Sequence, residues 1–190
     1  RIGRIDLLTE TERRRILTEW NSTPAPSPSG PDTVHELFGA QVERTPDAVA
    51  VSHLGQLISY AQLDAWTDRL ADALCARGMT NEDRVGLLLD RSATMVAAPL
   101  AVLKAGGAYV PLHGTDPDDR IRQVLSGSGT CLLLVDEAHA ERAARLGLPV
   151  QVVSGPGPEE PGRGPSHRVR VLPENLAYVI HTSGSTGAPK

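Results

Sequence analysis

Two short apolar runs constrain the fold of this chain more than any other feature of its sequence. Residues 84–89 read RVGLLL and residues 130–135 read TCLLLV, without the alternation of apolar and polar side chains that a half-exposed strand shows. A strand that is covered on both faces is apolar along its whole length. We therefore expect both runs to be strands of a sheet that has helices on each face.

Helical and strand patterns alternate around these two runs. Apolar side chains at helical spacing predict helices over 60–77, 92–105 and 137–146. Asp116-Pro117 predicts the start of another helix, with Asp116 as N-cap and Pro117 at the first helical position. Further strands are expected at 108–112, 149–153 and 176–180. This alternation favours an α/β fold with a mainly parallel sheet and flanking helices. In such folds, ligands bind where strands end and loops begin.

The first part of the chain is organised differently. Thr9 and Glu12 form a capping-box pattern that predicts a helix over 9–20, and the Pro-rich residues 21–32 are typical of a linker. A second capping box at Thr33 predicts another helix, followed by a hairpin that turns at Gly55. The apolar stripe of that helix comprises Val34, Leu37, Phe38 and Val42. We therefore expect an interdomain linker with one helix over 1–32 and a domain over 33–190.

Composition argues against several functions. The net charge of -4 and the aromatic content of 3% do not favour nucleic-acid binding. No apolar run approaches the ~20 residues that span a bilayer, so we expect no membrane partner and a cytoplasmic location. The two cysteines and six histidines lack the spacing of a disulfide framework or zinc site. Trp20, Tyr60, Trp66, Cys75 and Cys131 are interpreted as packing residues.

The sequence HTSGSTGAPK, residues 181–190, directly follows the last expected strand. Glycines allow the backbone to turn tightly and to expose successive N–H groups, which together bind anions. The loop adds hydroxyl groups and one lysine, and such a set suits a polyphosphate. A Walker-type loop has glycine directly before its lysine, whereas Pro189 stands there. The alternative is a flexible loop without a ligand, but a glycine loop after a strand is the usual geometry of phosphate sites.

Several stretches resemble adenylate-forming enzymes. LAYVIHTSGSTGAPK (176–190) resembles the phosphate-loop motif of that superfamily, which includes acyl-CoA synthetases, luciferases and the adenylation domains of nonribosomal peptide synthetases. ISYAQLD (58–64) and LKAGGAYVPL (103–112) are similar to the first and second core motifs of the adenylation domains. VHELFGAQVERTPDAVAV (34–51) is typical of the start of such domains, and LLTETERRRILTEWN (7–21) resembles the end of a linker from an upstream condensation domain.

The resemblance implies the first part of the large N-terminal subdomain of an adenylation domain, cut from a longer protein after the phosphate loop. Such a domain forms aminoacyl-AMP from an amino acid and Mg-ATP, and passes the aminoacyl group to the phosphopantetheine thiol of a downstream carrier domain. The loop would bind ATP phosphates, with Thr186 near Mg²⁺. Its expected binding residues are Thr182, Ser183, Gly184, Ser185, Thr186, Gly187 and Lys190. The principal catalytic lysine is expected beyond residue 190, so this chain alone would be inactive.

Some residues depart from the family pattern. The second motif usually continues Asp-Pro-x-Tyr-Pro-x-x-Arg, whereas residues 113–120 read HGTDPDDR. Pro99 predicts a kink or a late start of its helix. Asp90 and Asp136 follow strands and could approach a site, although capping or turn roles are favoured. Two alternatives stay open: an acyl- or aryl-CoA synthetase, and a degenerate module that acts as a scaffold.

Overall fold

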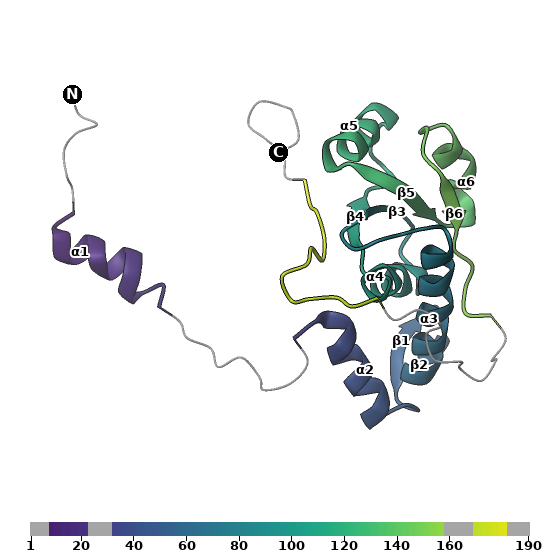
Figure 1. Cartoon of the computed structure of the whole chain (residues 1–190), viewed down its shortest axis with the longest axis horizontal. Coiled ribbons are helices and arrows are strands. Elements are labelled where there is room, and N and C mark those ends of the chain that lie inside the picture. Colours follow the sequence, from purple (N-terminus) through teal and green to yellow (C-terminus); the bar gives the residue numbers. More distant parts are fainter. Residues whose placement is uncertain (1–7, 23–31, 158–168, 182–190) are drawn as a thin grey trace. The chain divides into compact units, whose positions relative to one another are not determined.

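The computed structural model describes residues 8–22, 32–157 and 169–181, which belong to two separate units (Figure 1). The first unit contains helix α1, Glu10–Arg14, which continues as the π-helical turn η2, Arg15–Glu19. The predicted capping box is confirmed, because Thr9 Oγ1 accepts from the Glu12 N–H while the Glu12 carboxylate accepts from the Thr9 N–H. Trp20, interpreted above as a packing residue, is instead 64% exposed, with the Arg15 guanidinium over its ring. Residues 23–31 of the expected linker lie outside the described residues.

A four-stranded parallel sheet forms the centre of the second unit. Its order is β4-β3-β5-β6, with β3 at Arg84–Leu88, β4 at Ala108–Leu112, β5 at Thr130–Val135 and β6 at Val150–Val152. The two apolar runs thus occupy the interior positions of the sheet. The predicted α/β fold with a mainly parallel sheet is confirmed.

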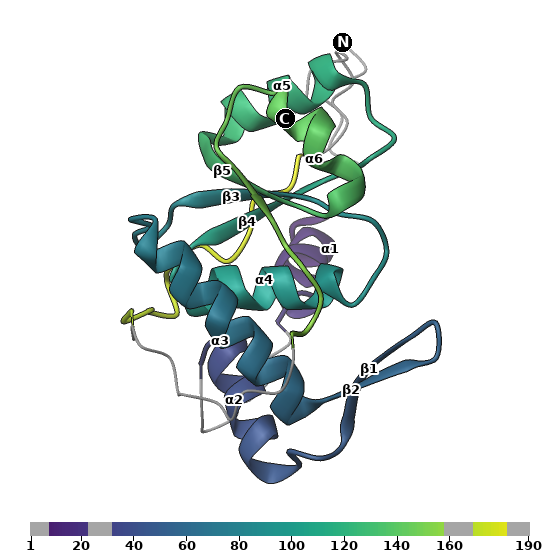
Figure 2. The same cartoon turned by 90° about the vertical axis from the view of Figure 1, so that its right-hand side faces the viewer.

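Helices cover both faces of this sheet (Figure 2). Helices α3, Tyr60–Ala76, and α4, Thr94–Lys104, pack with Leu132 and Leu134 of β5 in one core. Helices α5, Asp118–Ser128, and α6, Glu137–Ala144, pack with Leu133 and Val135 in a second core. Because successive side chains of a strand point to opposite faces, a strand between two cores has to be apolar throughout. Among the described residues, no helix has the length and apolar character needed to cross a membrane.

Helix α2, Val34–Arg44, and the hairpin of β1, Val49–His53, and β2, Gln56–Ser59, precede this layered part. The expected hairpin is antiparallel, and its turn residues Leu54 and Gly55 both have positive φ, 49° and 79°. The expected buried stripe of α2 is only partly correct. Phe38 packs against the first core, but Val34 and Leu37 are 55% and 49% exposed, because no described element covers that side of the helix.

Three further expectations need correction. Helix α4 starts at Thr94 with Pro99 inside it, so it does not start late at the proline, and the N-cap of α5 is Pro117 instead of Asp116. Cys131 is exposed and is not the packing residue that its apolar surroundings in sequence predict. The reason is a bulge: Arg84 pairs with Thr130 and Val85 pairs with Leu132, so Cys131 is an extra residue outside the regular alternation of β5.

Residues 176–180 do not form the expected strand. A single parallel bridge joins Tyr178 to Tyr109 of β4, which accepts from the Val179 N–H and donates to the Ala177 carbonyl. The backbone hydrogen-bonding groups of successive β4 residues point alternately to the two sides of the strand. Those of Ala108 point toward β3 and those of Tyr109 toward residues 177–179, so the next β4 residue directed at this segment is Pro111. Proline has no N–H to donate, so the ladder stops after one bridge.

Candidate functional site

The predicted phosphate-loop residues lie outside the described part of the chain. They are Thr182, Ser183, Gly184, Ser185, Thr186, Gly187 and Lys190. The structure describes the segment that leads into this loop, residues 169–181, and the loops that follow strands β3, β4 and β5. These two regions define the surroundings of the candidate site.

The segment before the loop follows the outer edge of β4. The Tyr109 N–H donates to the Ala177 carbonyl at 3.1 Å, and the Val179 N–H donates to the Tyr109 carbonyl at 3.0 Å. The rings of Tyr109 and Tyr178 lie 5.7 Å apart, and Val179 packs against the second core. Since this pairing is parallel, the segment runs toward the carboxyl end of β4, where ligands bind in folds of this kind.

His181 is the last described residue of this segment. Its ring is close to α5, because a Cβ placed on Gly127 would lie 3.5 Å from His181 Nε2. Its Nδ1 is buried and has no hydrogen-bond partner among the described residues. His181 is therefore held against α5 directly before the predicted loop in sequence.

Side chains from three loops gather at the carboxyl edge of the sheet. Asp90 follows β3 and Asp136 follows β5, and one oxygen of the Asp136 carboxylate accepts from the Asp90 N–H at 2.7 Å. The other oxygen accepts from the His139 N–H at 3.1 Å and lies 2.7 Å from His139 Nδ1. Burial favours a higher pKa of Asp136, but these hydrogen bonds and His139 outweigh it, and the pKa is lowered. Asp136 caps α6, so its predicted capping role is confirmed.

The loop after β4 packs against the same histidine. A Cβ on Gly114 would lie 2.6 Å from His139 Nε2, so glycine leaves the space that this ring occupies. The Arg142 guanidinium donates to the carbonyls of Gly114 and Asp116, and its Nε donates to the Asp118 carboxylate at 2.7 Å. This contact lowers the pKa of Asp118. The loop that departs from the family motif is therefore held by specific contacts, with His113 exposed beside it.

Sequence reasoning did not find His139 and Arg142. Asp136, His139 and Asp90 bring ligand-type atoms within 4.8 Å of one another. However, both oxygens of Asp136 already accept hydrogen bonds, and His139 Nδ1 is engaged by that carboxylate. These contacts give the cluster a structural role: it links the ends of β3 and β5 and caps the start of α6. The signal available in the sequence was an aspartate at a helix start, which is a preferred N-cap residue.

Comparison with known proteins gives consistent matches. Residues 38–190 match the protein family described as AMP-binding enzyme. The chain is 40% identical over 196 residues to a component of the linear gramicidin synthase of Brevibacillus parabrevis, with 100% of this chain and 4% of that protein covered. It is 43% identical over 190 residues to a component of the plipastatin synthase of Bacillus subtilis (strain 168), with 100% and 7% covered. A crystal structure of the nonribosomal peptide synthetase FmoA3, in an AMPPNP-bound form, matches with a TM-score of 0.74 and 29% identity over 94% of this chain and 19% of that one.

The chain thus spans a small share of each relative that it matches. The family match includes the parallel sheet, all four helices that cover it, and the predicted phosphate loop. The sequence relatives are components of synthases, and the similar solved structure is a nonribosomal peptide synthetase. The chain therefore belongs to the family of AMP-binding enzymes.

Proposed function

We propose that this chain forms the first part of an amino-acid-activating adenylation domain in a nonribosomal peptide synthetase. In the proposed reaction, the carboxylate of an amino acid attacks the α-phosphate of ATP, so that aminoacyl-AMP forms and pyrophosphate leaves. The phosphopantetheine thiol of a carrier domain then takes the aminoacyl group as a thioester. An upstream condensation domain and a downstream carrier domain are the proposed partners, residues 1–32 are the proposed linker, and a cytoplasmic location remains a prediction.

The observation that carries this proposal is the path of residues 176–181. They run parallel to β4 along the open edge of the sheet and continue in sequence into the glycine-rich motif. We propose that backbone N–H groups and hydroxyls of Thr182–Thr186 and Gly187, together with the Lys190 ammonium, bind the β- and γ-phosphates. Thr186 would lie near Mg²⁺. Donors held in place at these positions would stabilise the charge on departing pyrophosphate.

Amino-acid-dependent exchange of labelled pyrophosphate into ATP tests this proposal in the intact synthetase. Lys190→Ala removes one charge-assisted contact, so we expect roughly a tenfold or larger loss of ATP turnover. Gly187→Val adds a side chain where the backbone approaches phosphate and should have the largest effect, with Thr186→Ala intermediate. The order of preferred amino acids should not change.

Arg77→Ala provides a matched loss of one cation, because Arg77 is exposed at the end of α3, where the chain turns toward the start of β3. It should leave exchange unchanged. Near-normal ATP turnover in all three loop variants would contradict the phosphate-loop assignment. Exchange with acyl or aryl acids in place of amino acids would favour the CoA-synthetase alternative, and residues 1–190 alone should show no exchange.

A further inference from the structure

Glu82 occupies an unusual position just before β3. Its φ is +66°, in the left-handed region that is costly for residues other than glycine and asparagine. The Glu82 N–H donates to the Gly106 carbonyl at 2.9 Å, which fixes the backbone in this conformation. Because such a conformation persists only where surrounding contacts hold it, the partners of the Glu82 side chain are informative.

The Glu82 carboxylate binds the segment that leads to the predicted loop. Its Oε1 accepts from Asn175 Nδ2 at 3.0 Å and from the Leu176 N–H at 3.3 Å. Asn175 Oδ1 in turn accepts from the Leu172 N–H at 2.8 Å, which closes the turn before Leu176. These contacts lower the pKa of Glu82, so the carboxylate is ionised at neutral pH.

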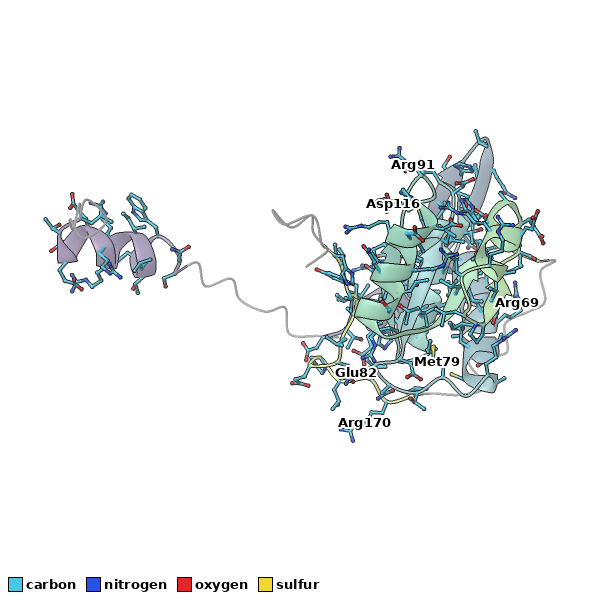
Figure 3. All side chains as sticks on the ribbon, turned by 90° about the horizontal axis from the view of Figure 1, so that it is seen from above. Arg69, Met79, Glu82, Arg91, Asp116 and Arg170 are labelled. Atoms are coloured by element: carbon cyan, nitrogen blue, oxygen red, sulfur yellow. The ribbon has the colours of Figure 1, made fainter. Side chains whose placement is uncertain are left out.

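The residue before Glu82 makes a second contact with the same segment. Asn81 Nδ2 donates to the Arg170 carbonyl at 2.9 Å, and Figure 3 shows Glu82 and Arg170 at the same end of the unit. Gly106 makes this contact possible. A Cβ on Gly106, whose φ is +83°, would lie 2.4 Å from Asn81 Oδ1 and 2.9 Å from Val169 Cγ1. Gly106, in the LKAGG stretch, thus leaves space for the contact that holds residues 169–176 against Asn81.

We propose that Glu82 and Asn175 are positioning residues for the phosphate loop, an inference that rests on the function proposed above. The segment 176–181 has one bridge to the sheet, at Tyr109, since Pro111 ends the ladder. Val179 and His181 add side-chain contacts with the second core and with α5, but among the described contacts the backbone of this segment is hydrogen-bonded to the sheet only at Tyr109. The Glu82–Asn175 contact supplies a second fixed point at Leu176, the start of the segment that leads to the loop. Neither side chain touches the phosphates in this scheme.

Variants of the intact synthetase test this inference. Glu82→Gly removes the carboxylate and suits the positive φ, so the loop 79–83 keeps its backbone conformation. Asn175→Asp keeps the acceptor for the Leu172 N–H but replaces the donor to Glu82 with a second carboxylate. Glu82→Gln retains an acceptor for both donors. Glu174→Gln is the matched control, because Glu174 is exposed on the same turn.

We expect Glu82→Gly and Asn175→Asp to raise the KM for ATP roughly three- to tenfold, the effect of losing about one ordinary net hydrogen bond. The KM for the amino acid should stay within twofold, as should all constants of Glu82→Gln and Glu174→Gln. Combining Glu82→Gln with Asn175→Asp restores a donor–acceptor pair and should recover most of the ATP affinity. Equal losses for ATP and amino acid would indicate a general structural defect and would overturn the positioning role.

Lys190→Ala is measured in parallel to separate the two proposals. If it impairs ATP turnover while Glu82→Gly and Asn175→Asp do not, the positioning role is wrong and the proposed function stands. If Lys190→Ala, Gly187→Val and Thr186→Ala all leave ATP turnover near normal, the phosphate-loop assignment fails, and the positioning role fails with it. Amide hydrogen exchange at Leu176 and Val179 gives a readout besides activity. Glu82→Gly should accelerate exchange there and Glu174→Gln should not, and unchanged exchange would contradict the second fixed point.

Discussion

Replacing Lys104 with methionine should destabilise the fold strongly. Lys104 Nζ lies 2.6 Å from Oδ1 of both Asp64 and Asp68, and the ring of Phe38 lies 5.4 Å from the same nitrogen. The side chains of Lys104 and Asp68 are 12% and 11% exposed. Methionine fills a similar volume, so the main effect of the substitution is to leave two carboxylates together without their cation.

The expected magnitude follows from this burial. Removing one partner of a buried ion pair costs about 3–5 kcal/mol, because the remaining charge is uncompensated. The Asp64 side chain is 32% exposed, so water screens part of its charge and the lower end applies. We therefore expect a loss of about 3 kcal/mol in the free energy of unfolding, or about 10 °C in Tm.

Urea unfolding followed by circular dichroism measures this loss. Arg145→Met is the matched control: Arg145 pairs with Glu141 at 2.8 Å, but the two side chains are 57% and 94% exposed. The free energy of unfolding of that variant should fall by less than about 1 kcal/mol. Adding Asp68→Asn to Lys104→Met removes one uncompensated charge and should recover part of the stability. If Lys104→Met costs no more than Arg145→Met, the argument from burial is wrong.

The pH dependence gives a second test of the same substitution. Burial raises the pKa of Asp68, Lys104 opposes this, and the nearby Asp64 and Asp72 raise it further. Without Lys104 the pKa of Asp68 should rise more. A carboxyl group with a raised pKa stabilises the fold while it is protonated, and that stabilisation is lost as the pH rises through the folded pKa. The cost of Lys104→Met should therefore be smaller near pH 5 than near pH 8.

Three further predictions concern single contacts. Gly86→Ala should lower the free energy of unfolding by about 1–3 kcal/mol in urea, because its Cβ would lie 2.6 Å from Leu133 Cδ2; a gain in stability would contradict the packing. Ser59→Ala removes the acceptor for the Gln62 N–H at 3.2 Å and should cost about 1 kcal/mol in thermal unfolding, whereas an unchanged Tm would argue against the cap. The lowered pKa of Asp136 stabilises the fold above the ordinary carboxyl range, so calorimetry should show the Tm deficit of Asp136→Asn shrinking as the pH falls from 7 toward 3.

The sequence alone determined the elements whose signals are local. The capping boxes at Thr9 and Thr33 each lie within one helical turn, so the residues that start the helix are adjacent in sequence. The apolar runs of β3 and β5 predicted interior strands, because a strand between two helical layers has no polar face. The glycine-rich motif likewise predicted a phosphate loop, from its composition, its place after an expected strand and its resemblance to adenylate-forming enzymes, and that assignment stays a prediction for residues outside the described part.

The tertiary structure decided the features that depend on distant partners. Residues 176–180 have the composition of a strand, but Pro111 on the neighbouring strand ends their pairing. The exposure of Cys131 follows from its register against β3, and the apolar stripe of α2 is only partly buried because no described element covers Val34 and Leu37. Glu82 and Asn175 meet only after the chain has folded. Pairing, register and coverage are set by which segments become neighbours in space, and no local pattern around a residue specifies its neighbours.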